Sequence, residues 1–321
     1  MTAVRRRLAA FFFGPLDPRP LAMFRIFLGV EILLHYLLLF PHWRRFYGRD
    51  GMLSLDVPTF TLAATGVPPE DWWSVFRLGD GVVPVHLWWV VGVVAALALI
   101  VGRASRLAAL VLWVMVSSAI HRNPAVVNGE EVVFRMLLFW SMFAPLGAVW
   151  AQDARAGADT PPRVTAGVWA ARCLQINFVL IYLISLPNKL VDDPAWLTGE
   201  AIYLALASDL WSRGLWPAAG WALDGWLSRL ATWGAIAVEG LAPWLVWWPR
   251  TAPFAIAALV ALHVGIAITL NGVAFFSLSM VVGCWLFAPP AWAARVWLVL
   301  GGVRRAVGTA VPSRTPGPER A

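Results

Sequence analysis

The segment Val82–Val101, VVPVHLWWVVGVVAALALIV, is the strongest indication of the fold class of this chain, because its 20 residues include no Asp, Glu, Lys or Arg. A helix needs roughly 20 mostly apolar residues to cross the hydrocarbon core of a bilayer. Lipid offers no partner for an unpaired backbone amide, so a stretch of this kind must be helical to span the membrane. The sequence therefore predicts a membrane-spanning helix here.

Further apolar stretches lie on both sides of this one. They are Leu21–Phe40, Leu107–Ile120, Val132–Trp150, Ala166–Leu186, Leu227–Trp248, Pro253–Leu270 and Ala274–Ala288. We expect an all-α, polytopic integral membrane helix bundle with about eight transmembrane helices. Leu107–Ile120 and Ala274–Ala288 are the shortest of these candidates.

The composition supports a membrane protein and excludes other classes. The 321 residues are 60% hydrophobic and 13% charged, whereas soluble domains carry about 25% charged residues. The 21 Trp fit the aromatic belts of membrane interfaces. The net charge of +7 predicts no nucleic-acid partner, because the basic residues form no single stripe. Cys173 and Cys284 lie far apart in apolar runs and predict neither a metal site nor a disulfide.

Four segments follow from this pattern. Residues 1–14 are a basic N-terminus, 15–290 the transmembrane domain, 291–311 an interfacial amphipathic helix and 312–321 a disordered tail. The first apolar stretch lacks a small-residue cleavage site and is expected to stay as an anchor. Pro289-Pro290 should end the last span. In the interfacial helix, Trp292 and Trp297 should face lipid and Arg295 should face water.

Arginines set the orientation, since cytoplasmic segments are enriched in basic residues. With the N-terminus inside, fourteen arginines lie in inner segments and seven basic residues in outer ones. We therefore expect a multi-pass protein of the inner (plasma) membrane with both termini in the cytoplasm. Two long outer loops, Pro41–Gly81 and Pro187–Trp226, mix Trp, Pro and acidic residues and should fold over the bundle as a cap.

Ionisable residues inside spans cost roughly 2.5–3.5 kcal/mol each on insertion scales, so they should face the bundle interior and pair. They are Arg25, Glu31, His35, Arg135, Arg172, Glu239 and His263. Glu31 and His35 share a helix face, and Arg25 is placed to snorkel to the interface. Glu239 needs a partner from another helix, with Arg135, Arg172 or His263 as candidates. Either a structural ion pair or a role in proton transfer would explain the presence of Glu239 in a span.

Lys189 is the only lysine among 25 basic residues. Arginine does not deprotonate in a protein, whereas a desolvated lysine can become a base. Lys189 follows Leu186-Pro187-Asn188 at the outer end of a predicted span, and Trp196 could cover a partly dry pocket around it. The competing interpretation is an interfacial lysine held in its charged form by Asp192 or Asp193. A second polar cluster, with His121, Arg122 and Asn128, is expected at the same face of the membrane, where it would cap helices or line a pocket.

Several blocks of sequence resemble one known family. They are Asp17-Pro18-Arg19-Pro20-Leu21-Ala22-Met23-Phe24-Arg25-Ile26, Phe46-Tyr47-Gly48-Arg49-Asp50-Gly51, His121-Arg122-Asn123-Pro124 with Asn128-Gly129, Asn188-Lys189 with Trp196-Leu197-Thr198-Gly199, and Leu262-His263. Over residues 15–290 the chain resembles the horizontally transferred transmembrane (HTTM) domain, the membrane part of vitamin K-dependent γ-carboxylases.

The resemblance implies a chemistry. In the carboxylases a lysine deprotonates vitamin K hydroquinone, and oxidation to the epoxide yields the strong base that removes a proton from a glutamate γ-carbon. Lys189 is similar in position to that lysine, and His263 resembles a family histidine near the same pocket. The implied catalytic residues are Lys189, His263, His121 and Glu239, with Arg122, Asn128 and Trp196 binding a membrane quinol such as vitamin K or menaquinol.

One departure opens an alternative. The carboxylases carry a large soluble region that docks the substrate protein, whereas this sequence ends at Ala321, soon after its last span. Protein carboxylation by the same route is therefore not expected. The alternative is a non-catalytic membrane protein for the maturation or export of a secreted peptide, with the two outer loops as its binding surface. A transporter is less favoured, because no paired broken spans are evident.

Overall fold

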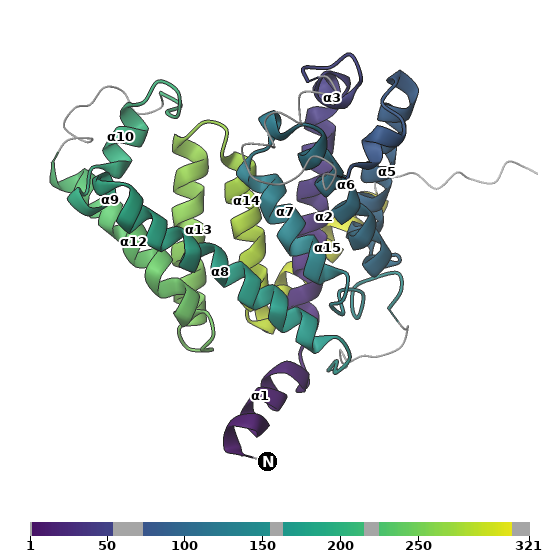
Figure 1. Ribbon diagram of the computed structural model, residues 1–321. Coiled ribbons are helices and arrows are strands. Elements are labelled where there is room, and N and C mark those ends of the chain that lie inside the picture. Colours follow the sequence, from purple (N-terminus) through teal and green to yellow (C-terminus); the bar gives the residue numbers. More distant parts are fainter. Residues whose placement is uncertain (1, 54–72, 155–162, 215–224, 310–321) are drawn as a thin grey trace, which may run out of the picture.

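The computed structural model describes residues 2–53, 73–154, 163–214 and 225–309, and this part of the chain is helical (Figure 1). Its helices are α1 (Ala3–Phe13), α2 (Arg19–Leu39), α3 (Trp43–Tyr47), α5 (Val82–Val101), α6 (Ser105–Arg122), α7 (Gly129–Ser141), α8 (Val168–Asp192), α9 (Pro194–Thr198), α10 (Ala201–Ala207), α12 (Trp226–Leu245), α13 (Ala252–Thr269), α14 (Ala274–Gly283) and α15 (Pro290–Thr309). Short 3₁₀ helices are η1 (Phe40–His42), η3 (Val75–Leu78), η4 (Pro124–Val126) and η5 (Cys284–Phe287). The predicted all-α fold is confirmed.

Among the described residues, four helices are long and apolar enough to cross a membrane. They are Arg19–Tyr47, which joins α2 to α3, and α5, α8 and α13. The pair Ala274–Phe287 and Pro290–Gly301 would add a fifth span if counted as one, although it is bent by 117°. The expected count of about eight is thus not confirmed. The helices α6 and α12 fall outside this set, and both carry ionisable side chains.

The helix predicted over Val132–Trp150 is wrong in its extent. Helix α7 ends at Ser141, and turns follow as far as Trp150. Pro145 stands in this segment and offers no amide hydrogen to continue the helix. At about 1.5 Å per residue, the 13 residues of α7 span about 20 Å, which is less than the hydrocarbon core.

The helix α2 runs through the middle of the bundle and packs against α5, α14 and α15 (Figure 1). Its buried face includes Phe24, Leu28, Ile32 and Tyr36. The indole of Trp89 on α5 donates a hydrogen bond of 2.8 Å to the carbonyl of Tyr36. The two helices approach closely because Gly92 of α5 has no side chain and lies against the Tyr36 ring.

Two glycine substitutions should therefore have opposite effects on stability. A Cβ atom at Gly92 would overlap the ring of buried Tyr36, so Gly92→Ala is expected to lower stability by about 1–3 kcal/mol. Gly265 in α13 is exposed with open space around it, so Gly265→Ala should raise stability by about 0.5–1 kcal/mol. Thermal unfolding of purified protein in detergent measures both. Equal melting temperatures for the two variants would contradict this account of the α2–α5 contact.

Arg25 does not snorkel to the interface as expected, because it is fully buried. Its guanidinium donates hydrogen bonds to the carbonyls of Leu99 (2.6 Å), Ile100 (2.8 Å) and Trp150 (2.6 Å). The first two belong to the last turn of α5, where the helix dipole is negative and carbonyls lack the usual helical partner; the Leu99 carbonyl also accepts a hydrogen bond of 3.2 Å from the Gly102 amide. Arg25 thus caps α5 from the neighbouring helix.

The break at Pro289-Pro290 is present, and α15 begins at Pro290. Trp297 stacks on Trp150 with ring centroids 4.9 Å apart, and Trp292 packs against the buried core. These two indoles therefore face protein, contrary to the expectation that they face lipid, whereas Leu298 and Val299 are exposed. The location of α15 at the membrane surface stays a prediction, and residues 310–321 lie outside the described residues.

The described parts of the two long loops lie against the helices. Arg49 and Asp80 form a salt bridge of 3.2 Å, and Ser74 donates a hydrogen bond of 2.9 Å to the carbonyl of Ser118 in α6. Residues 54–72 and 215–224 of these loops lie outside the described residues.

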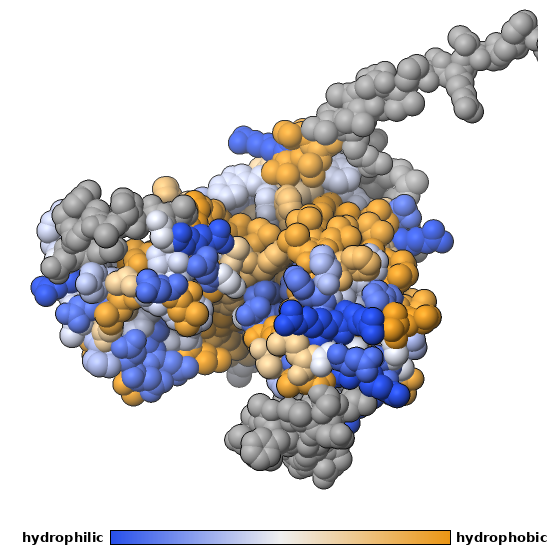
Figure 2. All heavy atoms as spheres, turned by 90° about the horizontal axis from the view of Figure 1, so that it is seen from above, coloured by the Kyte–Doolittle hydropathy of each residue, from blue (hydrophilic) through white to orange (hydrophobic). Residues whose placement is uncertain are grey.

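Seen from above, the molecule is hollowed between the part with α9, α10 and α12 and the part with α2, α6 and α7, and apolar side chains line much of the hollow (Figure 2).

Candidate functional site

Lys189 and Glu239 form an ion pair between α8 and α12. Lysine Nζ lies 2.5 Å from Glu239 Oε2, and the two side chains are 22% and 8% exposed. Glu239 therefore has the interhelical partner that a buried carboxylate requires. The partner is none of the predicted candidates, Arg135, Arg172 and His263. The helices approach here because Gly240 leaves room for Leu186.

Lys189 lies on a helix rather than in a loop. Helix α8 continues through Pro187 as far as Asp192, which places Lys189 in its last turn. At about 1.5 Å per residue, the 25 residues of α8 span about 37 Å, more than the roughly 30 Å hydrocarbon core. Helix α8 as a whole is therefore longer than the hydrocarbon core requires.

The ring of Trp196 packs against the Lys189 amine. Lys189 Nζ lies 4.6 Å from the centre of the Trp196 ring, within cation–π distance. Trp196 is held there by α9, whose N-cap Asp193 accepts a hydrogen bond of 2.9 Å from the Ala195 amide. Asp193 thus caps α9, and the salt bridge of Lys189 is with Glu239 rather than with either loop aspartate.

His263 of α13 lies near this pair and is buried. Its Nε2 is 3.0 Å from the hydroxyl of Tyr182, and its Nδ1 is buried with no hydrogen-bond partner among the described residues. Tyr182 precedes Lys189 by seven residues, so both lie on one face of α8, two turns apart. His263 is close enough for the charge of Lys189 to act on it. The sequence analysis did not identify Tyr182.

A pocket of about 600 Å³ opens beside Lys189, and we call it the lysine pocket. It is lined by Met136, Asn177, Leu180, Ile181, Ile184, Ser185, Asn188, Lys189, Asp192, Asp193 and Trp196. Its wall along α8 includes exposed Leu180 and Ile184, and most of its polar groups, Asn188, Lys189, Asp192 and Asp193, gather at one end, with Asn177 at the other. Such a division suits a ligand with one polar end and an apolar body.

His121 lies in a neighbouring pocket of about 400 Å³, together with Arg135. Its Nδ1 lies 2.8 Å from the Trp73 carbonyl oxygen. Met136 and Asn177 line both pockets, so the two adjoin across α7 and α8. At this junction the Asn177 side-chain oxygen is buried without a hydrogen-bond partner among the described residues. Sequence reasoning missed Asn177, because it is an isolated polar residue in an apolar run.

Arg122 and Asn128 do not reach the lysine pocket. The Arg122 guanidinium is buried and donates hydrogen bonds to the carbonyls of Gly48 (2.7 Å) and Leu53 (3.1 Å). Asn128 stands at the N-cap of α7. Of the seven predicted site residues, the structure brings together Lys189, Glu239, His263 and Trp196, places His121 in the adjoining pocket, and places Arg122 and Asn128 elsewhere.

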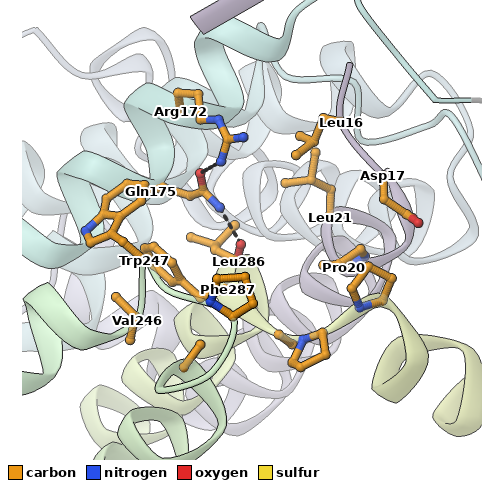
Figure 3. A pocket seen from close by; sticks show the side chains of 15 residues that line it. Leu16, Asp17, Pro20, Leu21, Arg172, Gln175, Val246, Trp247, Leu286 and Phe287 are labelled. Atoms are coloured by element: carbon orange, nitrogen blue, oxygen red, sulfur yellow. Dashed lines mark hydrogen bonds between the residues drawn. The ribbon is translucent and has the colours of Figure 1, made fainter. Parts of the chain in front are cut away.

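A third pocket, of about 370 Å³, lies at the other end of α8 beside Arg172 (Figure 3). Gln175 bridges Arg172 (2.8 Å) and the carbonyl of Leu286 (2.6 Å). Burial opposes ionisation of Asp17, but its hydrogen bonds with Arg19 hold the pKa of Asp17 below its usual value. Both charged groups of this pocket are thus engaged, and it lies about 25 Å along α8 from Lys189 at 1.5 Å per residue.

Comparison with known proteins identifies the family. No curated protein and no solved structure matches this chain. The HTTM domain matches residues 71–292, which is more than half of the chain and includes Lys189, Glu239, His263 and Trp196. The resemblance drawn from the sequence is therefore confirmed at the level of the family. With its apolar helices and this match, the chain is a membrane protein that belongs to the HTTM domain family.

Proposed function

We propose that this protein acts on a membrane quinol bound in the lysine pocket, with Lys189 as the base. The observation that carries the proposal is the position of the Lys189 amine. It lies between the Glu239 carboxylate and the Trp196 ring, at the polar end of a pocket with apolar walls. The membership in the HTTM family agrees with this assignment.

The residues present fit such a ligand. The volume of about 600 Å³ falls within the range of roughly 300–1,000 Å³ that is typical of small-molecule sites. Exposed Leu180 and Ile184 would contact the ring and the isoprenoid chain, and Lys189 would meet the hydroxyl. A quinol bound there would supply an acidic hydroxyl and two reducing equivalents.

Lys189 and Glu239 would handle the proton as a pair. Movement of the proton from Lys189 Nζ to Glu239 within their hydrogen bond leaves two neutral groups, which a low-dielectric site favours over separated charges. The neutral amine then accepts the hydroxyl proton of the ligand, and the resulting ammonium stabilises the oxyanion in a water-poor site. His263 would hold Tyr182 in place through the contact between its Nε2 and the Tyr182 hydroxyl.

The two adjoining pockets suggest how a longer ligand would lie. Because Met136 and Asn177 line both, a ligand anchored at Lys189 could extend past them toward His121 and Arg135. The Asn177 oxygen would accept a hydrogen bond from such a ligand. His121 would then act on the far end of the ligand rather than beside Lys189.

A Lys189→Arg variant tests the proposal. Arginine keeps the positive charge but does not release its proton, so quinol-dependent oxygen consumption by purified protein should fall at least 100-fold. Arg250→Lys is the matched control, because Arg250 is exposed and lies outside all the pockets described above. Retention of at least half of the wild-type rate by Lys189→Arg would exclude Lys189 as the base.

We further propose that the protein lies in the inner membrane with both termini in the cytoplasm. The excess of arginines in the segments before α2, after α5 and after α14 supports this orientation. It places Lys189 and Trp196 toward the outer face.

A role in the maturation of a secreted peptide is the alternative function, and it would survive the Lys189→Arg substitution.

A further inference from the structure

A second cluster of ionisable groups lies away from the lysine pocket, where α2, α7 and α14 pack together. It consists of His35, Glu130 and Glu131, which are 8%, 4% and 6% exposed. None of the three lines the lysine pocket or the pocket of His121. The proposed quinol chemistry does not use them.

The three side chains converge on one point. One ligand atom from each lies within 4.8 Å of the others, and His35 Nε2 is 3.5 Å from Glu131 Oε1. The other oxygen of Glu131 accepts a hydrogen bond of 2.8 Å from the Asn128 amide, which fixes the orientation of the carboxylate. Glu130 Oε2 is buried with no partner among the described residues. Buried carboxylate oxygens without a partner are costly and require an explanation.

The surroundings of the cluster are apolar and supply no basic side chain. The rings of Phe134 and Phe275 stand edge-on to the His35 imidazole, each with centroids 5.5 Å away. In the described part of the chain, no Lys or Arg lies within 4 Å of either glutamate. Glu31, one turn before His35, adds a third buried carboxylate, bound on one oxygen by the Ser279 hydroxyl (2.6 Å). The site thus lacks a compensating cation.

We propose that His35, Glu130 and Glu131 bind a divalent first-row transition-metal ion, of the class of Mn²⁺, Fe²⁺ or Zn²⁺. A divalent ion would balance the charges of the two ligand carboxylates, Glu130 and Glu131, beside a neutral imidazole, which burial in a low-dielectric interior favours. Ligand atoms at about 2.0–2.2 Å from one ion lie roughly 3–4.4 Å apart, the larger value only for a pair on opposite sides of it. The three candidate ligand atoms lie within 4.8 Å of one another, so binding would draw them together. Asn128 and Gly129, which precede Glu130 at the start of α7, are exposed, so the cluster lies close to the protein surface.

Metal binding to the full-length purified protein tests this proposal directly. After treatment with a chelator, the protein is titrated with MnCl₂, and bound Mn²⁺ is measured by its electron paramagnetic resonance signal. We expect one saturable ion per chain. Glu130→Gln and Glu131→Gln should weaken binding at least 100-fold, since even residues behind metal ligands affect affinity 10–100-fold. Glu200→Gln, which changes an exposed glutamate in the same way, should bind as wild type.

The wild-type measurement decides the question even if a variant folds poorly. An absence of saturable Mn²⁺, Co²⁺ and Zn²⁺ binding by monodisperse wild-type protein would overturn the proposal and assign protonated carboxyls to the cluster. Binding that both glutamine variants retain at wild-type affinity would overturn the site. The Lys189→Arg variant should keep the ion, so a failure of the quinol proposal and a failure of the metal proposal are distinguishable.

Discussion

Replacement of Arg25 by methionine is expected to destabilise the protein by about 3–5 kcal/mol and to leave little folded material after purification. The change removes one charged donor from three carbonyls, those of Leu99, Ile100 and Trp150. The Leu99 carbonyl keeps a hydrogen bond of 3.2 Å from the Gly102 amide, so the carbonyls of Ile100 and Trp150 are the two that lose their partner. Each buried carbonyl left without a partner costs about 1–3 kcal/mol, and the apolar contacts of methionine offset only part of this sum. The measurement is the melting temperature together with the monodisperse fraction on size-exclusion chromatography.

Two further variants make the Arg25 test specific. Arg25→Lys keeps the charge but loses the planar fork that reaches separate carbonyls, so its melting temperature should lie between those of wild type and Arg25→Met. Arg103→Met removes an exposed arginine just after α5 and should leave the melting temperature unchanged. If Arg25→Met and Arg103→Met melted at the same temperature, Arg25 would not be the cap of α5.

The second large effect is expected at the ion pair of the lysine pocket. Glu239→Leu should lower stability by about 2–4 kcal/mol, because breaking a buried pair leaves the remaining charge uncompensated. We place the value slightly below that of a fully buried pair, since the Lys189 side chain is 22% exposed. The same substitution at exposed Glu200 should have no measurable effect on thermal unfolding.

A double variant distinguishes the effect of the charge interaction from the effect of changing side-chain volume. Lys189→Met combined with Glu239→Leu removes both charges, and apolar replacement of a buried pair is often neutral or stabilising. The double variant should therefore be more stable than Glu239→Leu alone. Additive losses, with the double variant the least stable of all, would show that the two residues do not interact.

The sequence predicted most accurately those helix bounds that depend on local composition. Val82–Val101 matches the bounds of α5, because apolar composition and the flanking Gly81 and Gly102 act over short distances. The helix predicted over Val132–Trp150 was wrong because its end is not marked by a change in composition. A hydropathy window averages over residues 142–150, where the backbone turns although the composition stays apolar.

The contacts of the candidate site were harder to predict. Lys189 and Trp196 lie seven positions apart, and their proximity follows from local structure. The partner of Glu239 depends instead on how α8 and α12 are rotated about their axes, which periodicity does not determine for helices that are apolar nearly all round. The His35–Glu131 contact was missed because residues so distant in sequence meet only through the packing of α2, α7 and α14.

The contacts of α2 with α14 and α15 have a consequence for biosynthesis. Helix α2 packs against α14 and α15, which are translated more than 200 residues later. At roughly 5–20 residues per second, translation delivers α14 about 10–50 seconds after α2. During that interval the carboxylate of Glu31 lacks the hydroxyl of Ser279. The cost of burying Glu31 is therefore offset by this hydrogen bond only once α14 has been made.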